Sequence, residues 1–324
     1  MKNLKTILGT LIIATLTFTS CISDDDDNAP FQETLSYNDI QGFFVENSVK
    51  QQDFTLDASS GGTIIGEDGT EVTFPANAFV DDNGDPVTGT INISLKEIFD
   101  PSQMILSNKP TNAVNFSSEK TFLLSEGETE VIVSQNGDEV QLAIGVSYEI
   151  VVPSAGGLDN NMLPFAGTTS DNAGIVWNAT SDRGAGSNNT DISYNPAPSS
   201  YIYSAYNTGW TNCDKFYSDP RPKTTNYINL VNSPNATETV VFVIFEENNL
   251  PAVVKYTTSY DDGLQSYVDA MPIGLNVSYV AITVENNQLY MAVKNVTIAD
   301  EEELVMNFEL KTEQEVIDAL VALD

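Results

Sequence analysis

The stretch TINISLK, residues 90–96, decides the fold class of this chain. Isoleucine or leucine at positions 91, 93 and 95 alternates with polar residues at positions 92, 94 and 96. Successive side chains of a β-strand point to opposite faces of the sheet. The alternation therefore predicts a strand with one buried face.

Similar segments follow at short intervals, and turn residues such as Asn136 and Gly137 separate several of them. The predicted strands are residues 90–96, 129–134, 139–144, 147–152, 239–245, 252–257, 276–284, 288–293 and 304–310. In the last of these, the apolar residues at 304, 306, 308 and 310 are predicted to share one face. No long helical pattern lies between the strands, so the sequence predicts an all-β fold of two β-sandwiches in tandem.

The C-terminal residues have a different pattern. Thr312 and Glu315 have the spacing of a capping box, in which each residue caps the backbone of the other. Apolar residues at 316, 317, 320 and 321 then recur at helical spacing. We expect a short amphipathic helix that closes the chain and docks on the second sandwich.

Residues 181–199 are rich in Gly, Ser, Asn and Pro and offer little to bury, so a domain boundary is predicted there. The predicted organisation is a signal peptide at 1–20, an acidic tether and linker at 21–48, a first sandwich at 49–183, a linker at 184–200, and a second sandwich with the C-terminal helix at 201–324.

The N-terminus has the pattern of a secretory signal peptide. Lys2 and Lys5 precede an apolar run at 7–18, which is too short for a permanent membrane span of about 20 residues. Cys21 follows, and its place after the run resembles the lipobox of bacterial lipoproteins. That resemblance implies acylation of Cys21, with chains such as palmitate, and a membrane anchor. The alternative is an ordinary signal peptide with a chance cysteine.

An acidic cluster follows this cysteine directly: Ser23, Asp24, Asp25, Asp26 and Asp27. It resembles the export signal of Bacteroidota surface lipoproteins, which implies a place on the extracellular face of the outer membrane. The alternative is a solvated acidic tether on a lipoprotein that faces the periplasm, because runs of like charge repel one another.

Longer segments carry a family resemblance. GGTIIGEDGTEVTFPANAFVDDNGDPVTGTINISLKEI (61–98) and GWTNCDKFY (209–217) resemble a large group of Bacteroidota surface lipoproteins. The first module also resembles the β-sandwich shared by ankyrins and netrin receptors. MPIGLNVSYVAIT (271–283) resembles a prealbumin-like sandwich of the carboxypeptidase-regulatory type. These resemblances imply a fold and a location, and they bring no catalytic residues and no cofactor.

Charge and composition exclude several classes of binding partner and of catalytic site. A net charge of −33 disfavours nucleic acid, which leaves the membrane, through the anchor, and a protein or glycan ligand. The chain has no histidine, which excludes Ser-His-Asp and Cys-His catalysis and histidine zinc sites. After processing at Cys21 one cysteine remains, Cys213, and we expect a buried free thiol.

Two local patterns partly match known functional motifs, one catalytic and one calcium-binding. Ser117 and Lys120 have Ser-x-x-Lys spacing but lack the companion motifs of that nucleophile pair. Asp81, Asn83 and Asp85 begin like a calcium loop, although a hairpin turn also explains them. We predict no catalytic, cofactor-binding or metal-binding residue.

Aromatic residues are concentrated in residues 194–227, and Trp210 lies near the centre of that segment. They predict either a structural seam between the sandwiches, which we favour, or a binding surface for a glycan or protein. The predicted function is a non-catalytic binding, scaffold or adhesion role in the cell envelope. The alternative is a secreted hydrolase that uses carboxylates alone.

Overall fold

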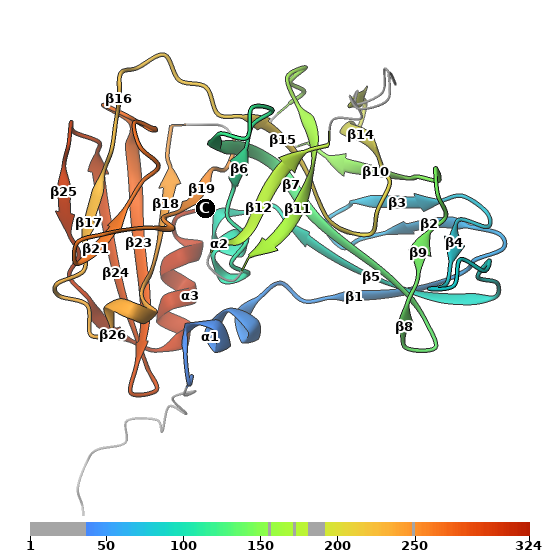
Figure 1. The fold of residues 1–324 in the computed structure, drawn as a ribbon, viewed down its shortest axis with the longest axis horizontal. Coiled ribbons are helices and arrows are strands. Elements are labelled where there is room, and N and C mark those ends of the chain that lie inside the picture. Colours follow the sequence, from blue (N-terminus) through green and yellow to red (C-terminus); the bar gives the residue numbers. More distant parts are fainter. Residues whose placement is uncertain (1–36, 155–156, 171–172, 181–191, 248–249) are drawn as a thin grey trace, which may run out of the picture. The chain divides into compact units, whose positions relative to one another are not determined.

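The computed structural model describes residues 37–154, 157–170, 173–180, 192–247 and 250–324 (Figure 1). These residues belong to one compact unit of the chain. The predicted signal peptide, Cys21 and the acidic cluster at residues 23–27 all lie outside the described residues.

The first sandwich consists of a large sheet and a five-stranded sheet, joined by a small strand pair. The large sheet has the order β1 (Gln52–Asp57), β5 (Thr90–Ile98), β7 (Lys120–Gln135), β15 (Gly209–Phe216), β11 (Leu163–Ser170), β12 (Gly174–Ala179) and β6 (Asn112–Val114), with β8 (Asp138–Glu139) paired to β7. The second sheet has the order β13 (Ser193–Pro196), β14 (Ser199–Ala205), β10 (Tyr148–Pro153), β3 (Glu71–Phe74) and β2 (Gly62–Ile65). The small pair is β4 (Phe79–Val80) and β9 (Gln141–Leu142).

Alternation along β5 forms the core of this sandwich as the sequence predicts. Ile91, Ile93 and Leu95 are buried in one cluster with Ile150 and Tyr201 from the facing sheet. The strand pairs on both sides, with β1 and with β7, so its backbone groups are satisfied.

The second sandwich has two principal sheets and a small strand pair. One sheet has the order β20 (Thr258–Tyr260), β21 (Gly263–Gln265), β17 (Tyr227–Asn229) and β25 (Glu303–Val305). The other has the order β19 (Val253–Lys255), β18 (Val240–Phe245), β23 (Asn276–Glu285), β24 (Gln288–Thr297) and β26 (Glu309–Lys311). The small pair is β16 (Lys223–Thr224) and β22 (Met271–Pro272), and a short 3-10 helix, η1 (Ala236–Glu238), precedes β18.

Strand β18 is apolar on both faces, and the structure shows why. Val241 and Val243 enter the core of the second sandwich, whereas Phe242 and Ile244 enter a different cluster on the opposite face. A sheet covered on both faces gives nearly continuous apolar strands. This accounts for the uninterrupted run VVFVIF.

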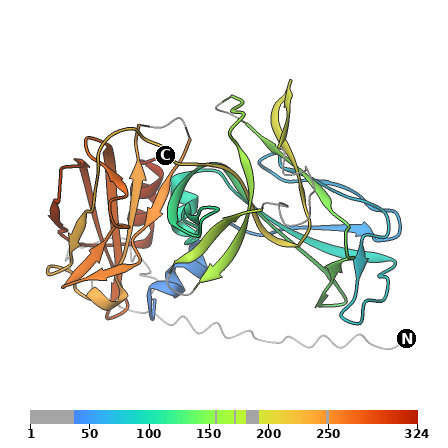
Figure 2. The same ribbon diagram turned by 45° about the horizontal axis from the view of Figure 1, so that its top comes forward.

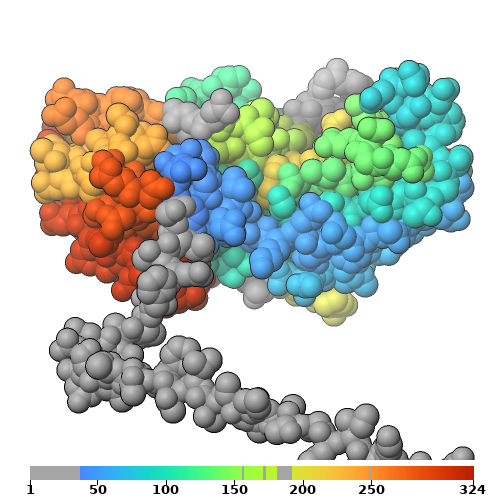
Figure 3. Space-filling view, turned by 90° about the horizontal axis from the view of Figure 1, so that it is seen from below, coloured from blue at the N-terminus to red at the C-terminus, as the bar shows by residue number. Residues whose placement is uncertain are grey.

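Three short helices lie at that opposite face: α1 (Ile40–Asn47), α2 (Pro101–Leu106) and α3 (Glu313–Val321) (Figures 1 and 2). Their buried residues form a single cluster with Phe242 and with Trp210 of the large sheet. Figure 3 shows the blue residues of α1 beside the orange and red residues of the second sandwich, and the rings of Phe44 and Phe242 lie 6.1 Å apart. This seam cluster gives the two sandwiches a shared apolar interior.

Hydrogen bonds to the backbone of β19 reinforce the seam. The Thr111 N–H donates to the Val253 carbonyl at 2.6 Å. The Asn112 side chain accepts from the Lys255 N–H at 2.7 Å and donates to the Lys255 carbonyl at 2.9 Å. All of these groups are buried, so their pairing is needed for stability and fixes how β6 meets β19.

The predicted domain boundary is wrong. The sequence predicts a second sandwich beginning at residue 201, but β14 pairs with β10 and β15 lies between β7 and β11, within the first sandwich. Of the predicted linker at 184–200, residues 193–196 form β13 and the part up to 191 lies outside the described residues. The composition of a loop does not reveal whether the chain returns to the same sheet after it.

The end of the predicted tether also needs correction, because residues 40–47 form α1 with Phe43 and Phe44 buried. The predicted strand 304–310 is divided into β25 and β26, which belong to different sheets, and Leu310 is exposed. The C-terminal helix is confirmed, with a capping box between Thr312 and Glu315. It lies in the seam cluster, where Val316 and Leu320 are buried.

Candidate functional site

A cleft of about 610 Å³ lies where α1 and the end of α2 meet the outer face of the large sheet. We call it the lysine cleft, because Lys96 and Lys109 line it together with Glu130, Trp210 and Phe44. Its volume is within the range of about 300–1,000 Å³ that is usual for small-molecule sites.

Strand register brings three of these side chains onto one face. Lys96 on β5 is paired with Glu130 on β7, and Glu130 is paired with Trp210 on β15. Directly paired residues of neighbouring strands share a face of the sheet. The Lys96 ammonium lies 3.0 Å from a Glu130 carboxylate oxygen, so Lys96 has a counter-ion within the cleft.

Lys109 has a different environment. Asn108 adopts a left-handed backbone conformation, with φ 50°, just after α2, and the Lys109 ammonium lies 5.1 Å from the centre of the Trp210 ring. Among the described residues, no carboxylate oxygen lies within 4.0 Å of that ammonium. Burial, the largest cause, lowers the pKa of Lys109. The charge of Glu130 opposes that shift, as Glu128 does only when it is ionised, and the charge of Lys96 adds to it.

The wall of the cleft near Asn108 depends on one glycine. Gly174 has φ 80°, and a Cβ on it would lie 2.2 Å from the Asn108 carbonyl oxygen. Only glycine permits this close approach of the start of β12 to the turn that carries Lys109.

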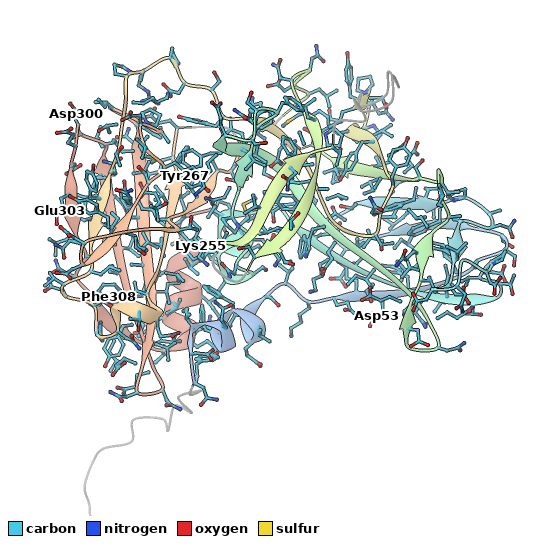
Figure 4. The ribbon with its side chains drawn as sticks, viewed as in Figure 1. Asp53, Lys255, Tyr267, Asp300, Glu303 and Phe308 are labelled. Carbon is cyan, nitrogen blue, oxygen red and sulfur yellow. The ribbon has the colours of Figure 1, made fainter. Side chains whose placement is uncertain are left out.

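A third lysine lies behind the same turn. The Lys255 ammonium donates to the Asn108 side-chain oxygen at 2.9 Å and lies about 6 Å from the rings of Phe44 and Phe242. Burial, and then the charge of Lys109, lower the pKa of Lys255 to about 8. Figure 4 labels Lys255 and the nearby Tyr267, whose hydroxyl accepts from Asn112 at 2.8 Å.

Two carboxylates lie buried in the same large sheet without lining the cleft. Glu128 and Asp214 are both fully buried. Asp214 accepts from the Asn212 side-chain amide at 2.6 Å, while neither oxygen of Glu128 has a hydrogen-bond partner among the described residues. Burial raises the pKa of both carboxyls, and the proximity of Asp214 adds to the effect on Glu128. Both shifts favour the neutral, protonated form.

A second cleft, of about 700 Å³, lies beside the connection from β14 to β15. We call it the tyrosine cleft, because Tyr203 and Tyr206 line it with Phe165, Trp210 and Glu149. Trp210 thus lines both clefts although it is only 8% exposed. A third hollow, of about 820 Å³, lies between α1 and the second sandwich, where Gln41 and Lys255 line it beside the exposed turn at 261–262.

The residues of the aromatic segment at 194–227 belong to more than one cluster. Trp210 belongs to the seam cluster as expected, but Tyr201, Tyr203 and Cys213 belong to the core of the first sandwich. Cys213 is confirmed as a buried free thiol. Tyr206 is 45% exposed at the mouth of the tyrosine cleft, so part of the segment faces solvent.

The two weak local patterns have structural explanations. The carboxylate of Asp81 accepts from the backbone N–H groups of Asn83 and Asp85, both at 2.9 Å, as in a hydrogen-bonded turn. Ser117 lies in a turn and Lys120 begins β7, so neither is on a helix. Within the described ranges, no group of three or more Cys, Asp or Glu side chains is arranged to hold a metal ion.

Sequence reasoning did not single out the lysines as a site. Lys255 gave the clearest signal, because it is the one charged residue in the apolar segment AVVKYT. Lys96 was assigned only to the polar face of its strand, and no local pattern points to Lys109.

Comparison with known proteins adds no assignment to this geometry. No protein-family model, no curated protein and no solved structure matches the chain. In the part of the chain that the structure describes, no helix is long and apolar enough to cross a membrane.

Proposed function

We propose that this chain is a lipid-anchored protein of the cell envelope, exposed at the outer face of the outer membrane, that binds a ligand and catalyses no reaction. The proposal includes kinship with the Bacteroidota surface lipoproteins that the sequence resembles. The lysine cleft is the observation that carries the binding role.

The anchor is supported by the order of residues at the N-terminus. Positive charge, a short apolar run and Cys21 follow one another at the spacing of a lipoprotein signal, and four aspartates come after Ser23. An acylated cysteine holds a protein at a membrane because each buried CH₂ contributes about 0.8 kcal/mol.

The binding role is supported by the shape and chemistry of the lysine cleft. The cleft combines a charged group, Lys109, with an aromatic wall, Trp210, and with polar groups such as Asn108 and Ser107. A concave site with a few convergent polar groups is the usual form of a ligand pocket.

The hydrolase alternative has less support from the same geometry. A glycosidase needs two carboxylates about 5–10 Å apart facing its substrate. Among the described residues that line the lysine cleft, Glu130 is the only carboxylate and it is paired with Lys96. Glu149 is the only described carboxylate lining the tyrosine cleft. The third hollow is lined by Glu238, Asp261 and Asp262, of which the two aspartates lie on an exposed turn.

Proteolysis of intact cells tests the proposed location. An epitope-tagged chain expressed in a Bacteroidota host should be degraded when proteinase K is added outside the cells. A variant with Asp24 to Asp27 replaced by Ala should stay in the membrane fraction but become protected. If the wild type is degraded only after the cells are lysed, the protein faces the periplasm and the surface location is wrong.

A further inference from the structure

Positive charge gathers at the lysine cleft in a chain that is otherwise strongly acidic. The chain has 13 Lys and Arg residues against 46 Asp and Glu residues. Two of the lysines line the cleft, and Lys255 contacts Asn108 behind its wall. Each of the three carries a charge that repels the others, so their convergence needs a physical reason.

The acidic residues nearby leave part of this charge unbalanced. Glu130 is bonded to Lys96 at 3.0 Å, so that pair is neutral as a whole. Glu128 and Asp214 are fully buried and do not line the cleft, and burial favours their neutral forms. The lining of the cleft therefore carries one net positive charge, at Lys109.

Lys109 is also short of hydrogen-bond acceptors. A lysine ammonium has three N–H donors. The Lys109 ammonium lies 5.1 Å from the centre of the Trp210 ring, and among the described residues no carboxylate oxygen lies within 4.0 Å of that ammonium. A ring face attracts the charge but accepts no strong hydrogen bond, so a half-buried ammonium is left to bind an external acceptor.

We propose that the lysine cleft binds a small organic anion, with a carboxylate or phosphate group on Lys109 and the polar remainder of the molecule on the amide and hydroxyl groups of the lining. This inference rests on the proposed binding role and names its ligand class. The remainder meets groups such as Gln41, Asn108 and Thr169, which suit hydroxyl groups of the ligand.

The clearest test is calorimetric titration of the purified full-length chain with matched probes. Galacturonate and galactose differ mainly in the carboxylate, and inorganic phosphate supplies the other anion alone. We expect at least one anion to bind, with galactose at least about tenfold weaker than galacturonate if a carboxylate is the ligand group. Binding by phosphate with none by galacturonate would assign the site to phosphate esters.

Variants locate the binding to Lys109. Lys109→Gln should weaken binding of the anion at least about tenfold, because it removes the unpaired charge. Lys294→Gln on β24, far from the cleft lining, is the matched control and should change affinity less than about twofold. Raising the salt concentration should weaken wild-type binding, since the site is partly open to solvent.

Two results overturn the inference. One is equal affinity for galacturonate and galactose with no effect of Lys109→Gln, which means that the cleft takes a neutral ligand. The other is no binding of either anion at concentrations up to about 10 mM. Neither result bears on the anchor or the surface location, which the proteolysis of intact cells tests separately.

Discussion

Glu128 is the residue whose environment is least favourable in this structure. Its carboxyl group is fully buried, and neither oxygen has a hydrogen-bond partner among the described residues. An ionised carboxylate there would lose its solvation without compensation. Burial and the neighbouring Asp214 therefore raise its pKa well above 4.5. Buried carboxyl oxygens without a partner are rare in native cores, and Glu128 lies in the strand that carries Glu130 of the lysine cleft.

Glu128→Gln should stabilise the protein, and the gain should grow with pH. A pKa raised by folding gives stability that is complete below the unfolded value, near 4.5, and is lost as pH rises toward the folded value. The wild type should therefore lose about 1.4 kcal/mol per pH unit relative to the variant across that window. Urea unfolding of both proteins at pH 5, 6, 7 and 8 measures this slope.

Glu139→Gln is the control, because Glu139 is exposed on β8 and should show no such trend. Asp214 is present in both proteins, so the difference between them isolates Glu128. A stability difference that stays constant from pH 5 to pH 8 would mean that Glu128 is not held in its neutral form.

The sequence could not indicate this residue, because its burial depends on strands that are distant in the chain, and the sheet is irregular beside it. The register of β7 against β15 shifts between Asn212 and Asp214. Gly127 lies at the shift with φ 156°, and a Cβ there would lie 2.4 Å from the Phe99 ring. A segment such as SEGETE looks exposed by composition, and only its central place in the sheet buries it.

Among the elements, α1 packs into the seam between the two sandwiches. Its N-cap Asp39 accepts from the Gly42 N–H at 2.8 Å, and Ile40, Phe43 and Phe44 point into the seam cluster. The spacing of these three residues is helical, so the signal was present in the sequence. The sequence prediction nevertheless places these residues in the tether at 21–48, and a helix of eight residues gives only a short apolar pattern.

Phe44→Ala and Val45→Ala test the role of α1 with two neighbouring residues. Phe44 is 3% exposed and packs on Phe242, so its truncation should cost about 3–5 kcal/mol of unfolding free energy. Val45 is 77% exposed, so its truncation should cost less than about 0.5 kcal/mol. Chemical denaturation of both variants gives the comparison, and equal small losses would show that α1 does not dock.

The sequence predicted best those elements in which the spacing of apolar residues is clear within a few residues. Strand 90–96 became β5 and strand 276–284 became β23, with nearly the predicted bounds. The helix at 313–321 was predicted from its capping box and apolar spacing. The prediction of one strand at 304–310 is wrong because the alternation of apolar residues continues from β25 to β26, which belong to different sheets.

At the scale of the whole molecule, the first sandwich closes only after residue 209. Strand β15 is inserted between β7 and β11, which come earlier in the chain. Pairing between distant segments is a tertiary property, and the loop composition at 181–199 gave no sign of it. The lysine cleft was unpredictable for the same reason, since β5, β7, β15 and two helices meet there.

Cleavage of the chain near residue 187 tests this organisation. A specific protease site inserted there would divide the covalent chain, but strands on both sides of the cut share the large sheet. The two fragments should therefore elute together in size-exclusion chromatography and separate only in denaturant. Two fragments that separate under native conditions would restore the boundary predicted from the sequence.

The proposed acyl chain on Cys21 would hold this protein at a membrane, and metabolic labelling with a fatty acid tests whether it is present. Cells that express the chain are grown with an alkyne fatty acid, and the purified protein is coupled to a fluorescent azide. We predict a labelled wild type in the membrane fraction and an unlabelled, incompletely processed Cys21→Ala variant. An unlabelled wild type, or a Cys21→Ala variant labelled as strongly as the wild type, would contradict the account.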